Sequence, residues 1–493
     1  MKYPNRNSDK PAMSAKRAIS ILLSATAIGL ILTGCAPVGP DYTPIKPEAP
    51  ERWGAAMAGG LSATQPDPDT LAQWWTIFND HELSSLEERA VNGNLELQTA
   101  QSRIQEARAL RGINQSRLFP AVGASAAASK IRSSESGGTG KEIDFYTAGF
   151  DAGWELDIFG GLRRSVEASQ ADLEASQVNL DSVLISLMAE VALNYVDVRI
   201  FQAQLTLTRA NIKTQEESYK LNRSRNQAGI IDELAVQESL RILESSRSQI
   251  PAIETRLSAA KNRLAVLLGR QPGEFALELA EKKAIPALPV TVAIGIPAET
   301  LRRRPDIRFA ERALAAQTAR VGVATADLYP KFRLTGTIGI ESVDSGDFLD
   351  WGSRFWSIGP SASWNVFDAG EIRQNIEVQT ARQEQALIQY QQTVLKAQEE
   401  VENALVAYAK EQRRRDSLDK AATAAQRAEL LARDKYQAGL VDFNNVLDAQ
   451  RSLLLLQNEL NLSTGAATAN LVRLYKSLGG GWEYASSLED TPN

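Results

Sequence analysis

The feature that most constrains this chain is an internal repeat. The stretch RNQAGIIDELAVQESLR (225–241) returns as KYQAGLVDFNNVLDAQR (435–451), so the Gln-Ala-Gly break recurs 210 positions later, at Gly439 after Gly229. The same offset aligns other landmarks: Leu118-Phe119-Pro120 with Leu328-Tyr329-Pro330, Trp154 with Trp364, and Leu268-Gly269 with Leu478-Gly479. A constant offset over about 150 residues indicates a duplication. Two copies are too few for a solenoid, so we expect a pseudo-symmetric protomer.

Both copies contain the same parts in the same order. A helical stretch is followed by two strand-like runs, a very long helical stretch, a glycine break and a shorter helix. The stretches before and between the copies are rich in Pro and Gly, which is typical of extended segments and linkers. The predicted segments are a signal peptide (1–34), an extended lipidated segment (35–70), repeat 1 (71–269, strand pair 121–157), a linker (270–297), repeat 2 (298–479, strand pair 331–367) and a tail (480–493).

The long helical stretches set the scale of each copy. Neither Leu162–Asn226 nor Glu371–Lys435 contains proline or glycine, and at about 1.5 Å per residue each run extends on the order of 100 Å. Apolar residues recur in steps of three and four, as in a coiled-coil seam: Leu387, Tyr390, Val394, Ala397, Val401, Ala404 and Tyr408 in the second copy; Leu184, Leu187, Val191 and Val198 in the first. A second stripe lies beside the first-copy seam, so each helix can pack on two neighbours. This favours a closed antiparallel cylinder of helices.

The two glycine breaks are predicted to be the turns of helical hairpins. Glycine readily adopts the left-handed conformation that ends many helices, and Asp232 and Asp442 follow Gly229 and Gly439 at the position of a side-chain cap. An ordinary helix-loop-helix explains the glycines. It does not explain why both turns also carry similar apolar and charged neighbours.

The strand-like runs alternate between apolar and polar residues. The alternation is clear in Phe145–Asp157, Lys331–Glu341 and Phe355–Phe367, and weaker in Ala121–Ser129. A transmembrane barrel strand requires such alternation over about ten residues, and a half-buried strand of a soluble sandwich has the same period. The export signal described below and the Trp and Tyr residues near the strand ends favour the barrel.

Four strands per chain cannot close a barrel. An open strand edge is unstable in hydrocarbon, so the chain must complete its barrel with copies of itself. Two copies would give eight strands and a packed interior, and three would give twelve strands and room for a lumen. The residues predict an oligomer and leave this number open.

The N-terminus carries an export signal. Lys16 and Arg17 precede an apolar run that ends in Leu32-Thr33-Gly34-Cys35, the arrangement of a secretory signal. This ending is similar to the bacterial lipobox, whose cysteine is lipidated, and two or more acyl chains hold a protein firmly at a bilayer. A buried thiol beside a membrane helix is the alternative. No long apolar run follows, so we expect any membrane span to consist of strands.

Composition excludes several classes of function. With one Cys, one His and a net charge of -6, the chain lacks the residues for disulfide frameworks, zinc clusters and His-based catalysis, and it is too acidic for a general nucleic-acid binder. We therefore expect no enzyme, metal site or cofactor. His81 is predicted to be a surface or capping residue. Arg302–Ile307 is predicted to be structural, because Pro305 and Asp306 suit a helix start.

Several stretches together resemble one family. WWTIFNDHELSSLEERAVNGNLELQTA (74–100), RRRPDIRFAE (302–311), SWNVFDAG (363–370), YQAGLVDFNNVLDAQRSLL (436–454) and the lipobox are similar to the TolC-like outer membrane efflux factors, and most to the lipoprotein branch typified by OprM and the NodT group. The resemblance implies a mainly α fold with a small β part. A long antiparallel α-helical barrel would join a transmembrane antiparallel β-barrel that is completed by trimerisation, with four strands per chain.

The resemblance also implies a periplasmic gate at the hairpin ends. In OprM-type proteins leucines close the tip, with an Asp and an Arg one to two turns further on. The matching positions here are Asn444, Asp448 and Arg451, so a polar Asn444 replaces the leucine, and the first-copy counterparts are Glu238 and Arg241. An exposed ion pair contributes only about 0.2–1 kcal/mol, so a partner can open such a gate. Plain helix-surface pairing of Asp448 and Arg451 is the equal alternative.

The predicted function is a passive, gated exit duct of a tripartite efflux pump. The resemblance implies a homotrimer, lipid-anchored at Cys35 in the bacterial outer membrane, that extends into the periplasm. It also implies a periplasmic adaptor, which contacts the tips at Gly229, Ile230, Gly439 and Leu440, and an inner membrane RND-type pump. A structural coiled-coil envelope lipoprotein and a duct for secreted peptides are the alternatives. The substrate stays open, although the absence of Met and His clusters disfavours a dedicated metal route.

Overall fold

The computed structural model describes residues 36–138, 140–276 and 278–482. The predicted signal peptide and Cys35 therefore lie outside the described residues. The chain divides into two compact units, which are described in turn. Unit 1 comprises Met1–Pro44, Glu106–Leu173 and Arg312–Leu387, and unit 2 comprises Ile45–Gln105, Glu174–Glu311 and Ile388–Asn493.

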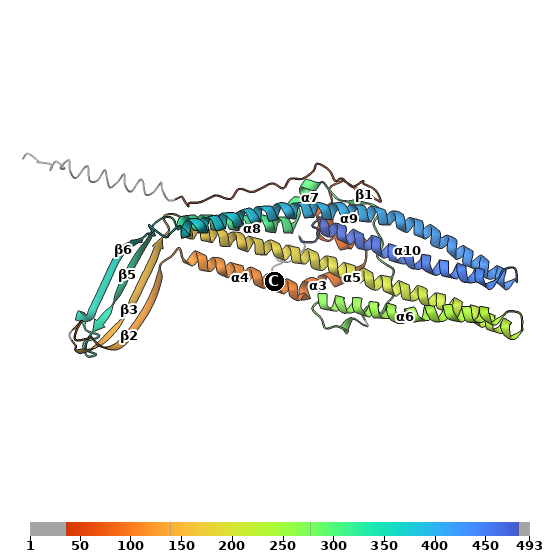
Figure 1. The fold of residues 1–493 in the computed structure, drawn as a ribbon, viewed down its shortest axis with the longest axis horizontal. Helices are drawn as coiled ribbons and strands as arrows, with labels where there is room; N and C mark the ends of the chain where they lie inside the picture. Colours follow the sequence, from red (N-terminus) through yellow and green to blue (C-terminus); the bar gives the residue numbers. More distant parts are fainter. Residues whose placement is uncertain (1–35, 139, 277, 483–493) are drawn as a thin grey trace, which may run out of the picture. The chain divides into compact units, whose positions relative to one another are not determined.

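Long helices dominate the chain, with one larger sheet (Figure 1). In chain order the elements are β1 (Leu61–Ser62), α2 (Pro68–Ala72), η1 (Trp74–Phe78), α3 (His81–Gly93), α4 (Leu95–Ser116), β2 (Ala121–Arg132), β3 (Glu142–Leu156), α5 (Gly161–Gln227), α6 (Glu233–Leu267), η2 (Glu274–Ala276), β4 (Val292–Ala293), α7 (Pro297–Arg303), α8 (Pro305–Ala326), β5 (Lys331–Ser342), η3 (Trp351–Ser353), β6 (Arg354–Ser363), α9 (Glu371–Gln437) and α10 (Phe443–Ser477).

Unit 1 contains a four-stranded antiparallel sheet with the order β2-β3-β5-β6 (Figure 1). The hairpins β2–β3 and β5–β6 come from the two copies, and β3 pairs with β5 between them. Within the described residues, the outer edges of β2 and β6 pair with no strand. Each free edge presents unpaired backbone N–H and C=O groups, so the sheet of one chain is open at both sides.

The two faces of this sheet differ, as the alternation predicts. One face carries large apolar side chains that are 59–74% exposed: Val122, Phe150, Ile338, Trp356 and Ile358. On the other face Asp151, Thr337 and Ser357 form a row across three strands, and the hydroxyls of Thr337 and Ser357 lie 2.6 Å apart. The sheet is therefore apolar on one face and polar on the other.

Each copy closes its strand pair with the same hydrogen bond. The indole of Trp154 donates to the carbonyl of Leu118 at 2.9 Å, and the indole of Trp364 donates to the carbonyl of Leu328 at 3.0 Å. Both partners of this bond recur at the offset of 210. The duplication is thus present in three dimensions as well as in sequence.

The predicted strand Phe355–Phe367 is wrong at its C-terminal end, because β6 stops at Ser363. Trp364 is held back to the preceding turn by its indole bond. Asp368 then accepts the backbone N–H groups of Gly370 and Ile372 and so caps α9. These two anchors turn the chain away from the sheet before the alternating pattern ends.

The long helices match between the copies. The helices α5 and α9 each contain 67 residues, α6 and α10 each contain 35, and corresponding helices begin 210 positions apart. None of the described helices is long and apolar enough to cross a membrane. His81 is exposed at the first position of α3, as predicted.

The first helical stretch of each copy is broken once, which the sequence analysis did not predict. The breaks lie at Asn94, between α3 and α4, and at Arg304, between α7 and α8. The amide of Asn94 donates to the carbonyl of Leu267 at 2.8 Å, and the guanidinium of Arg304 donates to the carbonyl of Ser477 at 2.8 Å. All four positions obey the offset of 210. In each copy, a side chain at the break in the first helical stretch is therefore hydrogen-bonded to the end of the last helix.

Arg304, the last residue of the basic run before α8, has the structural role that the sequence predicts for the run. Pro305 is the first residue of α8. The side chain of Arg304 is 8% exposed and lies 2.7 Å from the carboxylates of both Asp306 and Glu400. Because the guanidinium is buried and paired within the chain, it is not free to bind nucleic acid.

The core of unit 2 follows the predicted seams. Leu184, Val191 and Val198 are buried in the first copy and Val394, Val401 and Tyr408 in the second. Leu405 is buried in the second copy, whereas the predicted Ala404 is only partly buried. At this point of α9 the buried position is therefore shifted by one residue from the predicted one.

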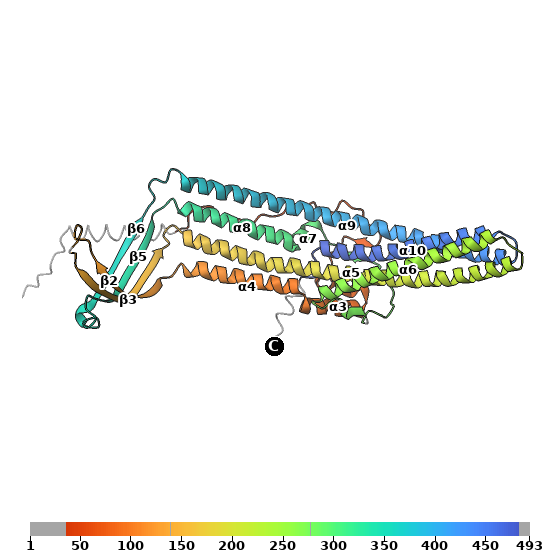
Figure 2. The same ribbon diagram turned by 60° about the horizontal axis from the view of Figure 1, so that its bottom comes forward.

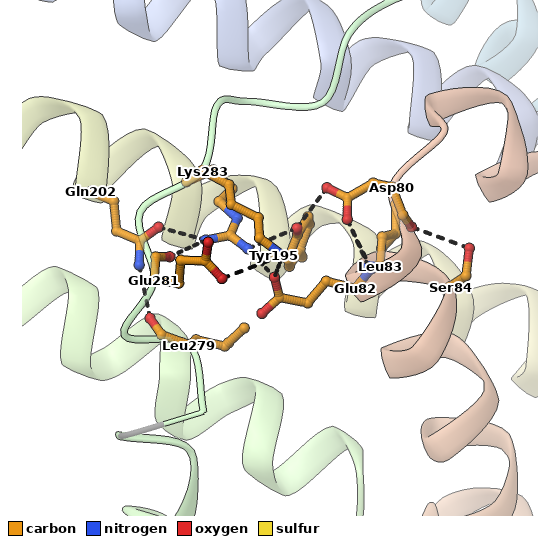
Figure 3. A network of polar contacts seen from close by, with 10 residues as sticks. Asp80, Glu82, Leu83, Ser84, Tyr195, Gln202, Leu279, Glu281 and Lys283 are labelled. Carbon is orange, nitrogen blue, oxygen red and sulfur yellow. Dashed lines mark hydrogen bonds and ion pairs between the residues drawn. The ribbon is translucent and has the colours of Figure 1, made fainter.

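A buried polar network lies at the end of the α5 core (Figure 3). Arg199 is fully buried and donates to the carboxylate of Glu82 at 2.6 Å, the hydroxyl of Tyr195 at 2.9 Å and the carbonyl of Glu281 at 2.8 Å. The Tyr195 hydroxyl donates to Asp80 at 2.6 Å. The network thus joins α5 to the start of α3 and to the segment between the copies.

The segments predicted as linker and extended arm are packed against the helices of unit 2. The linker residue Val292 is buried, and β4 pairs in parallel with β1 of the arm. The carboxylate of Glu402 on α9 accepts the backbone N–H groups of Gly54 and Ala55 at 2.6 and 2.8 Å. Both segments are therefore parts of the folded unit.

Candidate functional site at the hairpin ends

The two hairpin turns have the same backbone geometry. Gly229 and Gly439 both have φ of +73°, which a residue with a Cβ rarely adopts. The N–H of Ile230 donates to the carbonyl of Arg225 at 2.9 Å, and the N–H of Leu440 donates to that of Lys435 at 2.9 Å. This is the Schellman ending of a helix. The predicted turns at both glycines are confirmed.

The predicted caps differ between the copies. The side chain of Asp232 accepts the backbone N–H of Ala235 at 3.2 Å and so caps α6. Asp442 occupies the same position before α10 but makes no side-chain cap bond, so that prediction is wrong. Its backbone carbonyl instead accepts the backbone N–H and the side-chain amide of Asn445. The helix α10 therefore has no side-chain cap, and the carboxylate of Asp442 is exposed.

The predicted gate residues of the second copy lie on one face of α10. Asn444, Asp448 and Arg451 are all exposed. The guanidinium of Arg451 lies 3.7 Å from the carboxylate of Asp448, in an i, i+3 pair. In the first copy, Glu238 and Arg241 form no such pair among the described residues. The copies thus present different charge arrangements at matching positions.

The predicted tip residues are the outermost apolar groups of the turns. The side chains of Ile230 and Leu440 are 70% and 73% exposed, and Leu234 on α6 is 64% exposed. An exposed apolar residue next to a turn is usual when it stands alone. Here the same type of residue occurs at both turns, and the turns lie side by side (Figures 1 and 2).

A cluster that the sequence analysis missed joins the two hairpins. Arg225 of α5 stacks on the ring of Tyr436 at 4.6 Å and donates to the carbonyls of Tyr436 and Gln437, at the end of α9. The Tyr436 hydroxyl donates to the buried amide oxygen of Asn222 at 2.7 Å. Phe443 packs on the same ring at 5.3 Å. A cation beside the last carbonyls of a helix is also favoured by the helix dipole.

The only sequence signal for this cluster was the self-alignment. It places Arg225 opposite Lys435, and both precede a Gln-Ala-Gly break. Two basic residues at matching helix ends are usual. Nothing in the sequence shows that Arg225 caps the helix of the other copy, because that contact depends on how the hairpins pack.

An open groove of about 390 Å³ lies between the two turns. Its walls come from both hairpins: Arg225, Ile230, Ile231, Asp232, Leu234, Ala235 and Glu238 from the first, and Tyr436, Gly439, Val441, Asp442, Phe443 and Asn444 from the second. The lining combines apolar side chains with three carboxylates and one guanidinium. Such a surface is complementary to apolar and basic groups.

The chain matches known proteins over nearly its whole length. The family model described as outer membrane efflux protein matches residues 86–270 and 296–480, one match in each copy. The chain is 33% identical to nodulation protein T of Rhizobium leguminosarum bv. trifolii, over 87% of this chain and 91% of that protein. It is 32% identical to outer membrane protein OprJ of Pseudomonas aeruginosa, over 94% and 97% respectively.

The fold is also that of a solved channel. The outer-membrane channel OprN is 36% identical, and the similarity covers 90% of this chain and 99% of that one with a TM-score of 0.85. The resemblance derived from the motifs is thereby confirmed, as is the fold class.

Proposed function

Because the chain belongs to the family of outer membrane efflux proteins, we propose that it is the outer membrane channel of a tripartite efflux pump. In this role it is a passive, gated exit duct that carries small molecules across the periplasm and the outer membrane. The observation that supports this most strongly is the family match in both copies together with 36% identity to a solved outer-membrane channel. The duct itself catalyses no reaction.

The working unit of the proposal is a homotrimer in the outer membrane. One chain supplies four strands with free edges at β2 and β6, and in hydrocarbon those edges must be paired. Three chains give twelve strands, which leave room for a lumen. The exposed apolar face of the sheet then meets lipid, and an acylated Cys35 adds an anchor.

The gate of the proposal lies at the hairpin ends. Asn444, Asp448 and Arg451, with Glu238 and Arg241 of the first copy, would face their counterparts in neighbouring subunits. The Asp448–Arg451 pair is exposed at both partners, so it contributes at most about 1 kcal/mol. Without a leucine ring, several weak polar contacts would hold the gate, and a partner can outcompete them.

The partner at the tips is a periplasmic adaptor, which joins the duct to an inner membrane RND-type pump. Ile230 and Leu440 beside Gly229 and Gly439 supply exposed apolar contacts, and the groove between the turns supplies carboxylates. Adaptor contact at this groove would compete with the bonds that hold the hairpins together. Binding and opening are thus coupled.

Single-channel recording in planar bilayers tests the proposal. The wild-type protein should give discrete conductance steps. The variant Asp448→Asn/Arg451→Gln should open more often, because it lacks the charges that contact neighbouring subunits in the proposed gate. Glu254→Gln is the control, since Glu254 pairs with Arg209 at an exposed site away from the turns. A wild-type protein that inserts without conducting would support the structural tether instead. In a separate transport assay, export of a peptide without export of any small molecule would support the alternative, a duct for secreted peptides.

A further inference from the structure

One residue breaks the pattern of the polar face of the sheet. Phe355 is the second residue of β6, and its register places it on the same face as Ser357, Thr337 and Asp151. Among the described strands, the other aromatic on this face is Phe145, which is its counterpart 210 positions earlier, and both lie near the loop end of the sheet. Phe355 therefore places an apolar ring in the polar part of the sheet.

The row that contains Phe355 is otherwise made of the smallest residues. Phe355 pairs with Gly339, Gly339 with Gly149, and Gly149 with Ser125. A Cβ on Gly339 would lie 2.9 Å from Cε1 of Phe355, so the ring lies directly over that glycine. Glycine within a strand weakens it. Here the glycine leaves the space that the ring occupies.

The side chain of Phe355 is half-buried in the single chain. β6 is an edge strand (Figure 1), and in the closed barrel its free edge meets β2 of the next subunit. On its polar face, β2 offers only Ala121, Gly123, Ser125, Ala127 and Ser129 before Ile131. The register of β3 and β5, carried over to β6 and β2 at the offset of 210, places Ser133 opposite Phe355 and Ile131 opposite Ser357, and Ser133 is too small to cover the ring. Phe355 thus stays accessible from the lumen.

We infer that the three Phe355 rings of the assembled barrel form an aromatic collar in the lumen, which contacts aromatic and cationic cargo as it leaves. This inference rests on the proposed duct. Aromatic cations bind the faces of aromatic rings. Asp151, one row further along the same face, adds a carboxylate that attracts a positive charge. The cargo class that the collar favours is therefore the aromatic cation.

The first experiment asks whether the ring lines the water-filled lumen. The sequence contains a single cysteine, Cys35, so Phe355→Cys can be labelled selectively in the Cys35-acylated protein. A charged, membrane-impermeant thiol reagent added outside should label the Phe355→Cys variant. It should not label Trp356→Cys, which lies one residue on and on the apolar face. Equal labelling of both variants, or labelling of Trp356→Cys alone, would overturn the inference.

The second experiment measures the collar itself in planar bilayers. Tetraphenylphosphonium, an aromatic cation, should block the wild-type channel reversibly, and Phe355→Ala should weaken the block by about tenfold and raise the conductance. Phe355→Tyr, which keeps a ring, should retain the block. Ser357→Ala, on the same strand and face, is the matched control.

The outcomes separate the two proposals. If the wild-type protein forms no channels, the duct itself fails. If it conducts and Phe355→Ala leaves both block and conductance unchanged, the duct stands and the collar is wrong. A loss of block in Ser357→Ala equal to that in Phe355→Ala would likewise contradict the collar. The content of β structure in each variant, measured by circular dichroism, shows whether the sheet is intact.

Discussion

Two parts of the same helix, α5, are packed by different chemistry. Between Leu184 and Val198 its buried side chains are apolar or, at Tyr195, aromatic, and they form a core with α3, α9 and α10. After Leu205 the buried positions of α5 are Thr208, Gln215 and Asn222, seven residues apart and all polar. In the chain, the buried Arg199 lies between these parts.

The difference bears on the proposed gate, because it indicates which part of the helix costs less free energy to separate from its neighbours. Apolar surface costs about 25 cal/mol per Å² when it is returned to water, so the first part resists opening. Amides and hydroxyls can exchange their partners for water at a small net cost. The polar part contacts the second hairpin through two long bonds of 3.4 Å, Gln450 to Ser218 and Asn211 to Gln457. Among the described residues, its one short bond to that hairpin, from Tyr436 to Asn222 at 2.7 Å, lies near the turns. This suits hairpins that move apart at a gate.

The largest effect is expected at the boundary between the parts. Arg199→Met removes the guanidinium, so the Gln202 oxygen loses its donor and Glu82 keeps Lys283 as its remaining partner. Breaking a buried ion pair costs about 3–5 kcal/mol. Denaturation in detergent, followed by the helical circular dichroism signal, should show this loss. Arg209→Met is the control, because Arg209 pairs with Glu254 at the surface. An equal loss of unfolding free energy in both variants would show that the buried Arg199 stabilises the fold no more than the surface Arg209.

The next effect separates the apolar part from the polar part directly. Leu184→Ala should lower the free energy of unfolding by about 2–5 kcal/mol, because Leu184 is fully buried in the core. Gln215→Ala in the polar part should lower it by less than half as much, since the oxygen Oε1 has no hydrogen-bond partner to lose. Comparable losses would mean that the two parts contribute equally to the stability of the fold.

A third prediction concerns a carboxyl group on α3, the helix that packs against the apolar part of α5. Glu87 of α3 is fully buried, and neither of its oxygens has a hydrogen-bond partner. Burial raises the pKa of Glu87 well above its usual range. Its neutral form is therefore favoured in the folded chain, and stability is lost as the pH rises from the unfolded pKa through the folded one.

The variant Glu87→Met should accordingly be more stable than the wild type at neutral pH, by about 1–3 kcal/mol. The gain should shrink towards acid pH, where the wild-type carboxyl is protonated in both states. Thermal unfolding over a pH series gives both numbers. Glu88→Met, on the exposed side of α3, should show no such pH dependence. A gain that is constant with pH would show that Glu87 is not the titrating group.

The smallest effect is expected inside the polar part. Thr208 is fully buried and its hydroxyl has no partner, so Thr208→Val should stabilise the fold by about 1 kcal/mol. If this part separates on opening, the same variant should open less often in bilayers. Greater stability with unchanged opening would mean that the polar part does not move at the gate.

Sequence periodicity was enough to predict the long helices, the turns and the alternating strands. Each of these depends on the local spacing of residues, and the duplication repeats each pattern in a second copy, which supports the prediction. The limits of β6 were missed because the side-chain bonds of Trp364 and Asp368 override the alternation. The polar heptads at Thr208, Gln215 and Asn222 were visible in the sequence. Their polar side chains do not distinguish buried positions from the exposed polar positions of the same helix.

The candidate site was less predictable than the fold. The turns at Gly229 and Gly439 follow from backbone chemistry. The contacts of Arg225 and Tyr436 join residues more than 200 positions apart, so they depend on the packing of one hairpin against the other.

The number of chains in the purified protein tests the central claim most directly, because one chain carries an open sheet with free edges at β2 and β6. Native mass spectrometry of the mature, detergent-extracted protein should give a mass three times that of one acylated chain. A folded monomer that keeps its sheet and conducts in bilayers would contradict the account.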